Sequence, residues 1–163
     1  EGIKASVEAG AALEQSIGGI ETLFKESSDT MIQYANNAFR TCGLSANDYM
    51  ETTTSFAASM LSSVGGDTAK AAELSNNALI AMSDNANKMG TNMQDIQNAY
   101  QGFAKQNYTM LDNLKLGYGG TKEEMQRLLS DANKLNKQQG IITDYSIDSL
   151  QILRKQFRLY RIT

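Results

Sequence analysis

A cluster of glycines followed by threonine and lysine is the part of this chain that most resembles a chemical site. Glycine-rich loops that end in lysine and a hydroxyl residue can cradle phosphate groups with their backbone N–H groups. That motif needs four residues between its glycine and its Gly-Lys pair, and a strand before it. Here threonine comes before lysine, and no strand is predicted upstream. We interpret the cluster as a flexible connection between helices; its residues are Gly117, Tyr118, Gly119, Gly120, Thr121 and Lys122.

Other residue types that carry chemistry are scarce. The chain has no histidine, the usual general base and commonest metal ligand, and one cysteine, Cys42, which we interpret as a packing residue. Asp84 and Asp95 do not have the spacing of a calcium-binding loop. Glu123 and Glu124 come where acidic residues favour the start of a helix. We therefore predict no catalytic, cofactor-binding or metal-binding residues, and no enzymatic activity.

Two further patterns have ordinary explanations. Asn107-Tyr108-Thr109 matches the sequon for N-linked glycosylation, a tripeptide that is common by chance. Most of the methionines fall on apolar helical stripes, where their flexible side chains fill gaps in a core. The alternative is a surface that repacks around a partner helix. The methionines on these stripes are Met60, Met82, Met89, Met93, Met110 and Met125.

Composition and charge favour a helical protein. The chain has 163 residues, 41% of them hydrophobic, and no proline, so long helices are expected around one core. No stretch approaches the roughly 18 apolar residues that a membrane span needs. The net charge of −3 argues against a dedicated nucleic-acid-binding surface. The start lacks the regions of a signal peptide, and we expect it to continue a helix of a longer protein.

Helix starts and stops recur through the first half of the chain. Ser28 or Asp29 can cap a helix that runs to about Thr41 and ends at Gly43. Ser45 can cap the next helix. After two further glycines, a third helix is predicted from an aspartate cap; its boundaries are Asp67 and Lys88.

The second half continues in the same way. Gly90 ends the third helix, Thr91 starts the next one, and the segment 92–104 has one apolar face. Thr121 with Glu124 three residues later forms a capping box for the helix that follows. Ser146 can cap a last helix from Ile147 to about Tyr160, and a short strand is conceivable only at Gly140–Thr143.

The pattern as a whole predicts an all-α fold, a multi-helix bundle of about six to seven helices with residues 1–150 as one domain. Tyr100, Tyr108 and Tyr118 are predicted to pack against helices rather than to contact a ligand. The asparagines of the third helix, Asn76, Asn77, Asn85 and Asn87, are predicted to lie mostly outside its apolar stripe. The predicted core residues are Met31, Tyr34, Ala35, Ala38, Phe39, Tyr49, Met50, Phe56, Met60, Leu61, Leu74, Ala78, Ala81, Met82, Met93, Ile96, Ala99, Tyr100, Phe103, Met125, Leu128, Leu129, Ala132 and Leu135.

Two long runs of the sequence, Glu14–Leu61 and Gly65–Leu129, resemble phage tail tape measure proteins, in the globular helical region of the long-tailed phage and prophage family. The resemblance covers about Glu14–Leu135 and is most specific at Ser83–Leu129. It implies a structural protein of the virion that occupies the tail tube lumen and sets tail length, and that is in the host cytoplasm during assembly. The implied partners are the tail tube protein, tail assembly chaperones and tail tip proteins, with possible self-association, no specific nucleic acid, and membrane contact only during ejection. Members of this family are usually much longer, so we expect a fragment or a truncated gene.

The last residues depart from that family, which has a mostly acidic helix after the position of Leu150. Here residues 151–163 contain Arg154, Lys155, Arg158 and Arg161 and no acid, so residues 1–150 have 11 basic against 18 acidic residues. One hypothesis is a one-base frameshift after Leu150; the other is a genuine basic amphipathic helix. For the function, the alternative from another class is a helical protein-binding or secreted interaction module without enzymatic activity.

Overall fold

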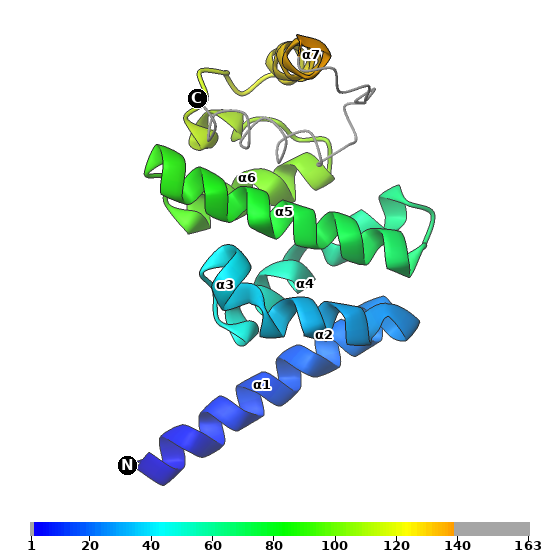
Figure 1. Ribbon diagram of the computed structural model, residues 1–163, viewed down its shortest axis with the longest axis vertical. Coiled ribbons are helices and arrows are strands. Elements are labelled where there is room, and N and C mark those ends of the chain that lie inside the picture. Colours follow the sequence, from blue (N-terminus) through cyan, green and yellow to red (C-terminus); the bar gives the residue numbers. More distant parts are fainter. Residues whose placement is uncertain (1, 139–163) are drawn as a thin grey trace. The chain divides into compact units, whose positions relative to one another are not determined.

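The regular structure of the chain is helical. The computed structural model describes residues 2–138, and every regular element in this range is a helix, which confirms the predicted all-α fold (Figure 1). The residues cluster into two compact units, the N-terminal unit, Glu1–Leu79, and the C-terminal unit, Ile80–Thr163. The predicted boundary at residue 150, the predicted helix 147–160 and the conceivable strand at 140–143 lie outside the described residues.

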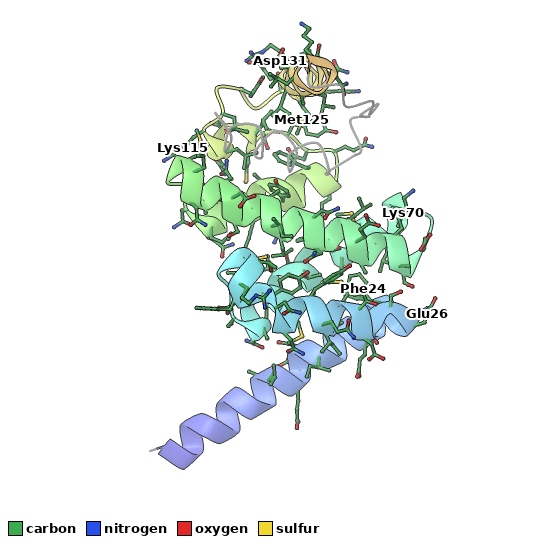
Figure 2. All side chains as sticks on the ribbon, in the orientation of Figure 1. Phe24, Glu26, Lys70, Lys115, Met125 and Asp131 are labelled. Atoms are coloured by element: carbon green, nitrogen blue, oxygen red, sulfur yellow. The ribbon has the colours of Figure 1, made fainter. Side chains whose placement is uncertain are left out.

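The N-terminal unit packs its first helix against the second and the fourth. α1 contacts α2 and α4, and α2 also contacts α4. Phe24, at the end of α1, has no exposed surface (Figure 2). Gly19 faces α4, where a Cβ atom added to it would lie 3.4 Å from Thr54 Cγ2. The elements are α1 (Gly2–Phe24), η1 (Lys25–Ser27), α2 (Ser28–Asn36), α3 (Ala38–Cys42), α4 (Ala46–Ser63) and the first part of α5 (Thr68–Met89).

The prediction that Ser28 or Asp29 caps α2 was wrong. Ser28 is the first residue of the helix, and Ser27, at the N-cap position, makes no side-chain capping hydrogen bond. The Ser27 hydroxyl is instead hydrogen-bonded to the Thr68 hydroxyl in a buried contact of 2.9 Å. A contact distant in sequence therefore uses the group that would otherwise cap the helix.

The helix predicted to run to about Thr41 is interrupted at Asn37, and Phe39, in the short helix that follows, faces away from the core. In the short helix α3, Ala38 and Cys42 are buried, whereas Phe39 is 79% exposed. Residues four apart share one helical face, and Phe39 is about 100° away from that face. Its assignment to the core was wrong; Met31, Ala35 and Ala38 are in the core as predicted.

Most helix boundaries have the local chemistry that the sequence indicates. Gly43 ends α3 with a φ of +68°. Ser45 Oγ accepts a hydrogen bond of 3.1 Å from the Asp48 N–H at the start of α4. Asp67 Oδ1 accepts one of 3.0 Å from the Lys70 N–H at the start of α5. These three predictions are confirmed.

The restart after α5 differs by one residue from the prediction. The N-cap of α6 is Asn92, whose Oδ1 accepts hydrogen bonds from the N–H groups of Gln94 and Asp95. The hydroxyl of Thr91 instead donates a 2.7 Å hydrogen bond to Asn85 Oδ1. Thr91 was predicted to start the helix, but its side chain is already engaged in a buried contact.

The C-terminal unit contains the second part of α5, α6 (Met93–Ala104), η2 (Leu111–Leu114) and α7 (Lys122–Gln138). η2 packs on α6. The predicted apolar faces of α6 and α7 are buried, apart from half-buried residues at their ends such as Met93 and Leu135. The fully or almost fully buried residues of this unit include Ile96, Ala99, Tyr100, Leu111, Leu114, Leu128 and Ala132.

Candidate functional site

The glycine cluster forms the last part of the connection between α6 and α7 and follows a 3-10 helix rather than a strand. Gly117 has a φ of +85°, which favours glycine. Gly120 touches the backbone of an earlier part of the same connection, since a Cβ atom on it would lie 2.3 Å from the Thr109 carbonyl oxygen. The two glycines therefore serve different backbone requirements, a left-handed turn and a close approach.

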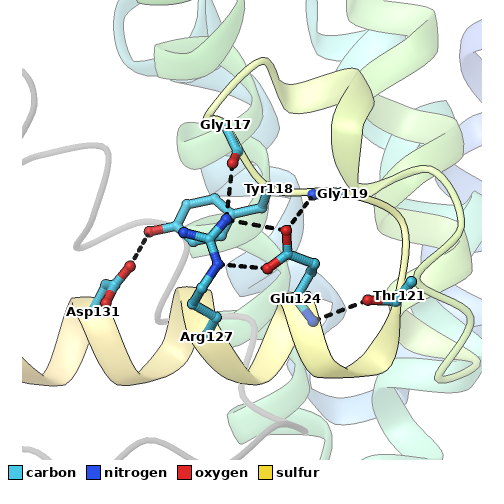
Figure 3. Close-up of polar contacts among 7 residues, drawn as sticks. All are labelled: Gly117, Tyr118, Gly119, Thr121, Glu124, Arg127 and Asp131. Atoms are coloured by element: carbon cyan, nitrogen blue, oxygen red, sulfur yellow. Dashed lines mark hydrogen bonds and ion pairs between the residues drawn. The ribbon is translucent and has the colours of Figure 1, made fainter.

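The predicted capping box at α7 is half formed. The Glu124 N–H donates a 3.1 Å hydrogen bond to Thr121 Oγ1, as predicted. The reciprocal bond goes elsewhere, because Glu124 Oε1 accepts from the N–H of Gly119, at 3.3 Å, rather than from the N–H of Thr121 (Figure 3). Glu124 thus takes part in capping the start of α7 through its backbone N–H and holds the glycine cluster through its side chain.

Arg127 binds both Glu124, in the first turn of α7, and the glycine cluster. Its guanidinium forms an ion pair with Glu124, in which both carboxylate oxygens accept hydrogen bonds. It also donates a 3.0 Å hydrogen bond from Nη2 to the Gly117 carbonyl oxygen. The hydrogen bond from Arg127 and that from the Gly119 N–H lower the pKa of the Glu124 carboxyl, and Glu124 in turn raises the pKa of Arg127.

Tyr118 contacts Arg127 and also Asp131, which is one turn further along α7. Its hydroxyl donates a 2.7 Å hydrogen bond to Asp131 Oδ2, and its ring lies 4.3 Å from the guanidinium carbon of Arg127. Only 7% of Tyr118 is exposed. Figure 3 shows the ring and the guanidinium stacked over α7, with Glu124 and Asp131 on either side. We call the six residues Gly117, Tyr118, Gly119, Glu124, Arg127 and Asp131 the Arg127 cluster.

The Arg127 cluster is suited to holding a loop against a helix. The guanidinium already has a carboxylate, a carbonyl oxygen and an aromatic face as partners, so a phosphate group would have to displace Glu124. Lys122 is exposed in the first turn of α7, and no contact brings it to the glycines. The arrangement does not resemble the ring of backbone N–H groups that binds phosphate.

A second polar cluster lies inside the C-terminal unit, around Asn85. This residue has no exposed surface, although it was predicted to lie mostly outside the apolar stripe of its helix. Its Nδ2 donates a 3.0 Å hydrogen bond to the Leu114 carbonyl oxygen, while its Oδ1 accepts from Thr91. Asn77, on the part of α5 that belongs to the N-terminal unit, is also largely buried, with 9% of its surface exposed. For these two asparagines the prediction was wrong, and for Asn85 the reason is its pair of buried hydrogen bonds; Asn87 is exposed as predicted.

The remaining candidate residues lie apart from the Arg127 cluster. Cys42 is 5% exposed, with its sulfur 3.4 Å from the Thr41 hydroxyl, in agreement with a packing role. Burial, followed by the nearby Cys42, raises the pKa of Tyr49, whose hydroxyl donates a 2.8 Å hydrogen bond to Asn76. Among the described residues, no group of three or more His, Cys, Asp or Glu side chains could hold a metal ion.

The tyrosines of this region pack as predicted. Tyr100 is fully buried and Tyr108 is 6% exposed, and the ring of Phe103 lies within 5.6 Å and 6.2 Å of their ring centroids. Burial, and then Asp84, raise the pKa of the Tyr100 hydroxyl. In the sequon, Asn107 Oδ1 accepts hydrogen bonds from both the N–H and the hydroxyl of Thr109.

The methionines divide between core and surface. Of the six methionines on the predicted stripes, most of which were expected to fill the core, three are buried: Met60, Met82 and Met125. Met110 is 45% exposed. Met89 and Met93 are half-buried.

Sequence reasoning did not identify Arg127, Tyr118 and Asp131 as a group. The i, i+3 spacing of Glu124 and Arg127 was the available signal. Comparisons of the chain with protein families, curated proteins and solved structures give no match. Within residues 2–138, none of the helices combines the length and the apolar character needed to cross a membrane.

Proposed function

We propose that this chain is a structural phage protein, part of the tail tape measure that occupies the lumen of the tail tube and sets tail length. The observation that carries the proposal is the resemblance of Glu14–Leu135 to that family, above all at Ser83–Leu129. Its proposed partners are the tail tube protein, tail assembly chaperones and tail tip proteins. Its proposed location is the virion, and the host cytoplasm during assembly.

The positions of the most specific residues support a structural role. Ser83–Leu129 covers the end of α5, all of α6 and η2, and the start of α7. Within it, two polar side chains hold elements together: Asn85 binds the backbone of η2, and Arg127 binds the glycine cluster. These two contacts are consistent with the proposed structural role.

The proposal is tested in the phage or prophage that encodes this sequence. Tails are purified, and mass spectrometry is used to look for peptides of residues 1–138. In parallel, the tagged chain is expressed during tail assembly and its bound proteins are identified. We expect the peptides in purified tails and the tail tube protein or an assembly chaperone on the tagged chain. Tails of normal length from which the chain is absent, in a strain that produces it, would overturn the proposal.

The state of residues 151–163 is tested separately. We propose that they result from a one-base frameshift after Leu150, because their four basic residues and lack of acids depart from the mostly acidic helix that the resembled family has at this position. Sequencing the gene decides between this and a genuine basic helix. Restoring one base should give an acidic, helix-forming continuation; a continuation without that character would reject the frameshift.

A second candidate function is a helical protein-binding module, and the exposure of Phe39 favours it. An aromatic side chain that is 79% exposed is of the kind that anchors protein interfaces. The tagged chain and its Phe39→Ala variant are compared for bound host proteins, with Met110→Ala as a control on the other unit. A host partner that is lost only with Phe39→Ala supports this function; the same bound proteins for all three chains reject it.

A further inference from the structure

One residue at the bend between α1 and α2 has a backbone conformation that side chains disfavour. Lys25 has a φ of +47° and is not glycine. In the left-handed region the Cβ atom of an L-residue comes too close to a carbonyl oxygen. On either side, Phe24 has a φ of −98° and a ψ of −8°, and Ser27 has a φ of −96° and a ψ of 5°, so both keep negative φ angles. The bend therefore depends on a strained conformation of Lys25.

The sequence across this bend is compatible with an uninterrupted helix. Residues 20–36 contain neither glycine nor proline. If Lys25 and Ser27 both took helical angles, α1 and α2 would join into one helix from residue 2 to residue 36, and the backbone hydrogen bonds of the α-helix would continue through the present break. The strain at Lys25 would be removed.

Straightening within a single chain would cost more than it gains. It would take α1 away from α4 and expose Ile20 and Phe24, which have no exposed surface. It would also break the 2.6 Å hydrogen bond from the Ser16 hydroxyl to Asn47 Oδ1. A second copy of the chain, however, offers the same α2 and α4 surfaces, so every one of these contacts can form again between copies.

We propose that two copies of this chain exchange α1. Each copy straightens at Lys25, and its α1 packs on α2 and α4 of the other copy. The exchanged dimer keeps the packing of the closed chain and removes the strain of two lysines, and short strained hinges are known to promote this kind of exchange. This inference is independent of the proposed function, because it rests only on the packing of the N-terminal unit.

The first test measures the mass of the full 163-residue chain by size-exclusion chromatography with light scattering, over a range of concentrations. We expect a concentration-dependent dimer of twice the 17.8 kDa chain mass. Lys25→Gly removes the strain in the bent form and disfavours the straight helix in both copies, so the dimer dissociation constant should rise by roughly a thousandfold. Lys70→Gly, at an exposed position of α5, is the control and should leave that constant within a few fold. A wild-type chain that stays monomeric, or a Lys25→Gly chain that dimerises equally well, overturns the proposal.

The second test asks whether α1 is exchanged. Cysteines replace Ser16 and Asn47 in a Cys42→Ser background, and the isolated dimer is treated with a short bifunctional maleimide. In the exchanged dimer the paired positions belong to different copies, so denaturing electrophoresis should show covalent dimers. Crosslinks that remain within single chains would mean that the copies associate without exchange, and would overturn the proposal. The Lys25→Gly comparison stands independently if this variant does not fold.

Discussion

The hydroxyl of Tyr118 and the carboxylate of Asp131 are joined by a 2.7 Å hydrogen bond that connects the loop before α7 to the second turn beyond its start. Tyr118→Phe removes this bond and leaves the ring against Arg127. We expect the free energy of unfolding to fall by about 1–2 kcal/mol, because the lost partner is a part-buried carboxylate. Urea denaturation measures it, as a lower midpoint with an unchanged slope.

Tyr34→Phe is the matched control for that variant. Tyr34 is half-buried, and no hydrogen bond of its hydroxyl is found among the described residues. Its replacement should change the free energy of unfolding by less than about 0.5 kcal/mol. Equal losses for the two variants would show that the bond to Asp131 does not stabilise the fold.

Gly120 and Gly119 are neighbours with opposite tolerance for a side chain. A Cβ atom on Gly120 would lie 2.3 Å from the Thr109 carbonyl oxygen, and backbone atoms cannot easily move away. We expect Gly120→Ala to lower the free energy of unfolding by about 2–3 kcal/mol. On Gly119 the nearest atoms are 3.7 Å away, on the flexible side chain of Glu124, so Gly119→Ala should change stability by less than about 0.5 kcal/mol. Thermal denaturation of the two variants would contradict this if Gly119→Ala were the less stable.

Arg127→Ala should raise the pKa of the Glu124 carboxyl toward its ordinary value of 4.5, because it removes the main cause of the lowered pKa. Carbon-detected NMR titration of the glutamate side chains measures this. Lys134→Ala, further along the exposed side of α7, is the control and should leave the Glu124 titration almost unchanged. If the pKa of Glu124 stayed low in Arg127→Ala, the hydrogen bond from the Gly119 N–H would be sufficient to lower it, and the role assigned to Arg127 would be wrong.

The lowered pKa of Glu124 also determines how the stability of the fold should change with pH. Glu124 releases its proton more readily in the folded chain than in the unfolded one, so the ion pair stabilises the fold above the ordinary glutamate pKa. This contribution is lost as the pH falls from the ordinary value through the lowered one. Because the pair is on the surface, salt should weaken it. The stability difference between wild type and Arg127→Ala should therefore shrink at low pH and at high ionic strength.

Asn85→Ala should be among the more damaging single substitutions in the C-terminal unit. It leaves the Leu114 carbonyl oxygen and the Thr91 hydroxyl without the partner that they share, inside the core. We expect a loss of about 2–4 kcal/mol in the free energy of unfolding. Asn87→Ala, on the exposed side of the same helix, should cost less than about 0.5 kcal/mol. Similar denaturation midpoints for the two variants would refute a stabilising role of the Asn85 cluster.

The parts of the fold that were predicted correctly depend on neighbours in sequence. Gly43, Ser45 and Asp67 act through backbone groups within three or four residues, and the apolar faces of α6 and α7 follow from helical spacing alone. The capping of Glu124 by Thr121 is of the same kind. Local hydrogen bonding and periodicity are properties of a short segment, so one sequence suffices to predict them.

The errors and omissions involve partners that are distant in sequence. Asn85 looks like a surface residue until Leu114, 29 positions away, is brought to it. Ser27 could have capped α2, but Thr68, 41 positions away, is bonded to it. Asp131 joins the Arg127 cluster only because the loop before α7 folds back over that helix. Periodicity contains no information about such contacts, and the candidate site was therefore predicted less completely than the helices.

The connection from Lys105 to Thr121 has little regular structure, yet four of its side chains, Tyr108, Leu111, Leu114 and Tyr118, are buried. A protease must accommodate an extended segment of about ten residues, which here would pull these side chains out of the core. Trypsin cleavage after Lys105 or Lys115 would therefore be limited by opening of the C-terminal unit rather than by loop fluctuations. The rate of cleavage at these two lysines would then report how often that unit unfolds.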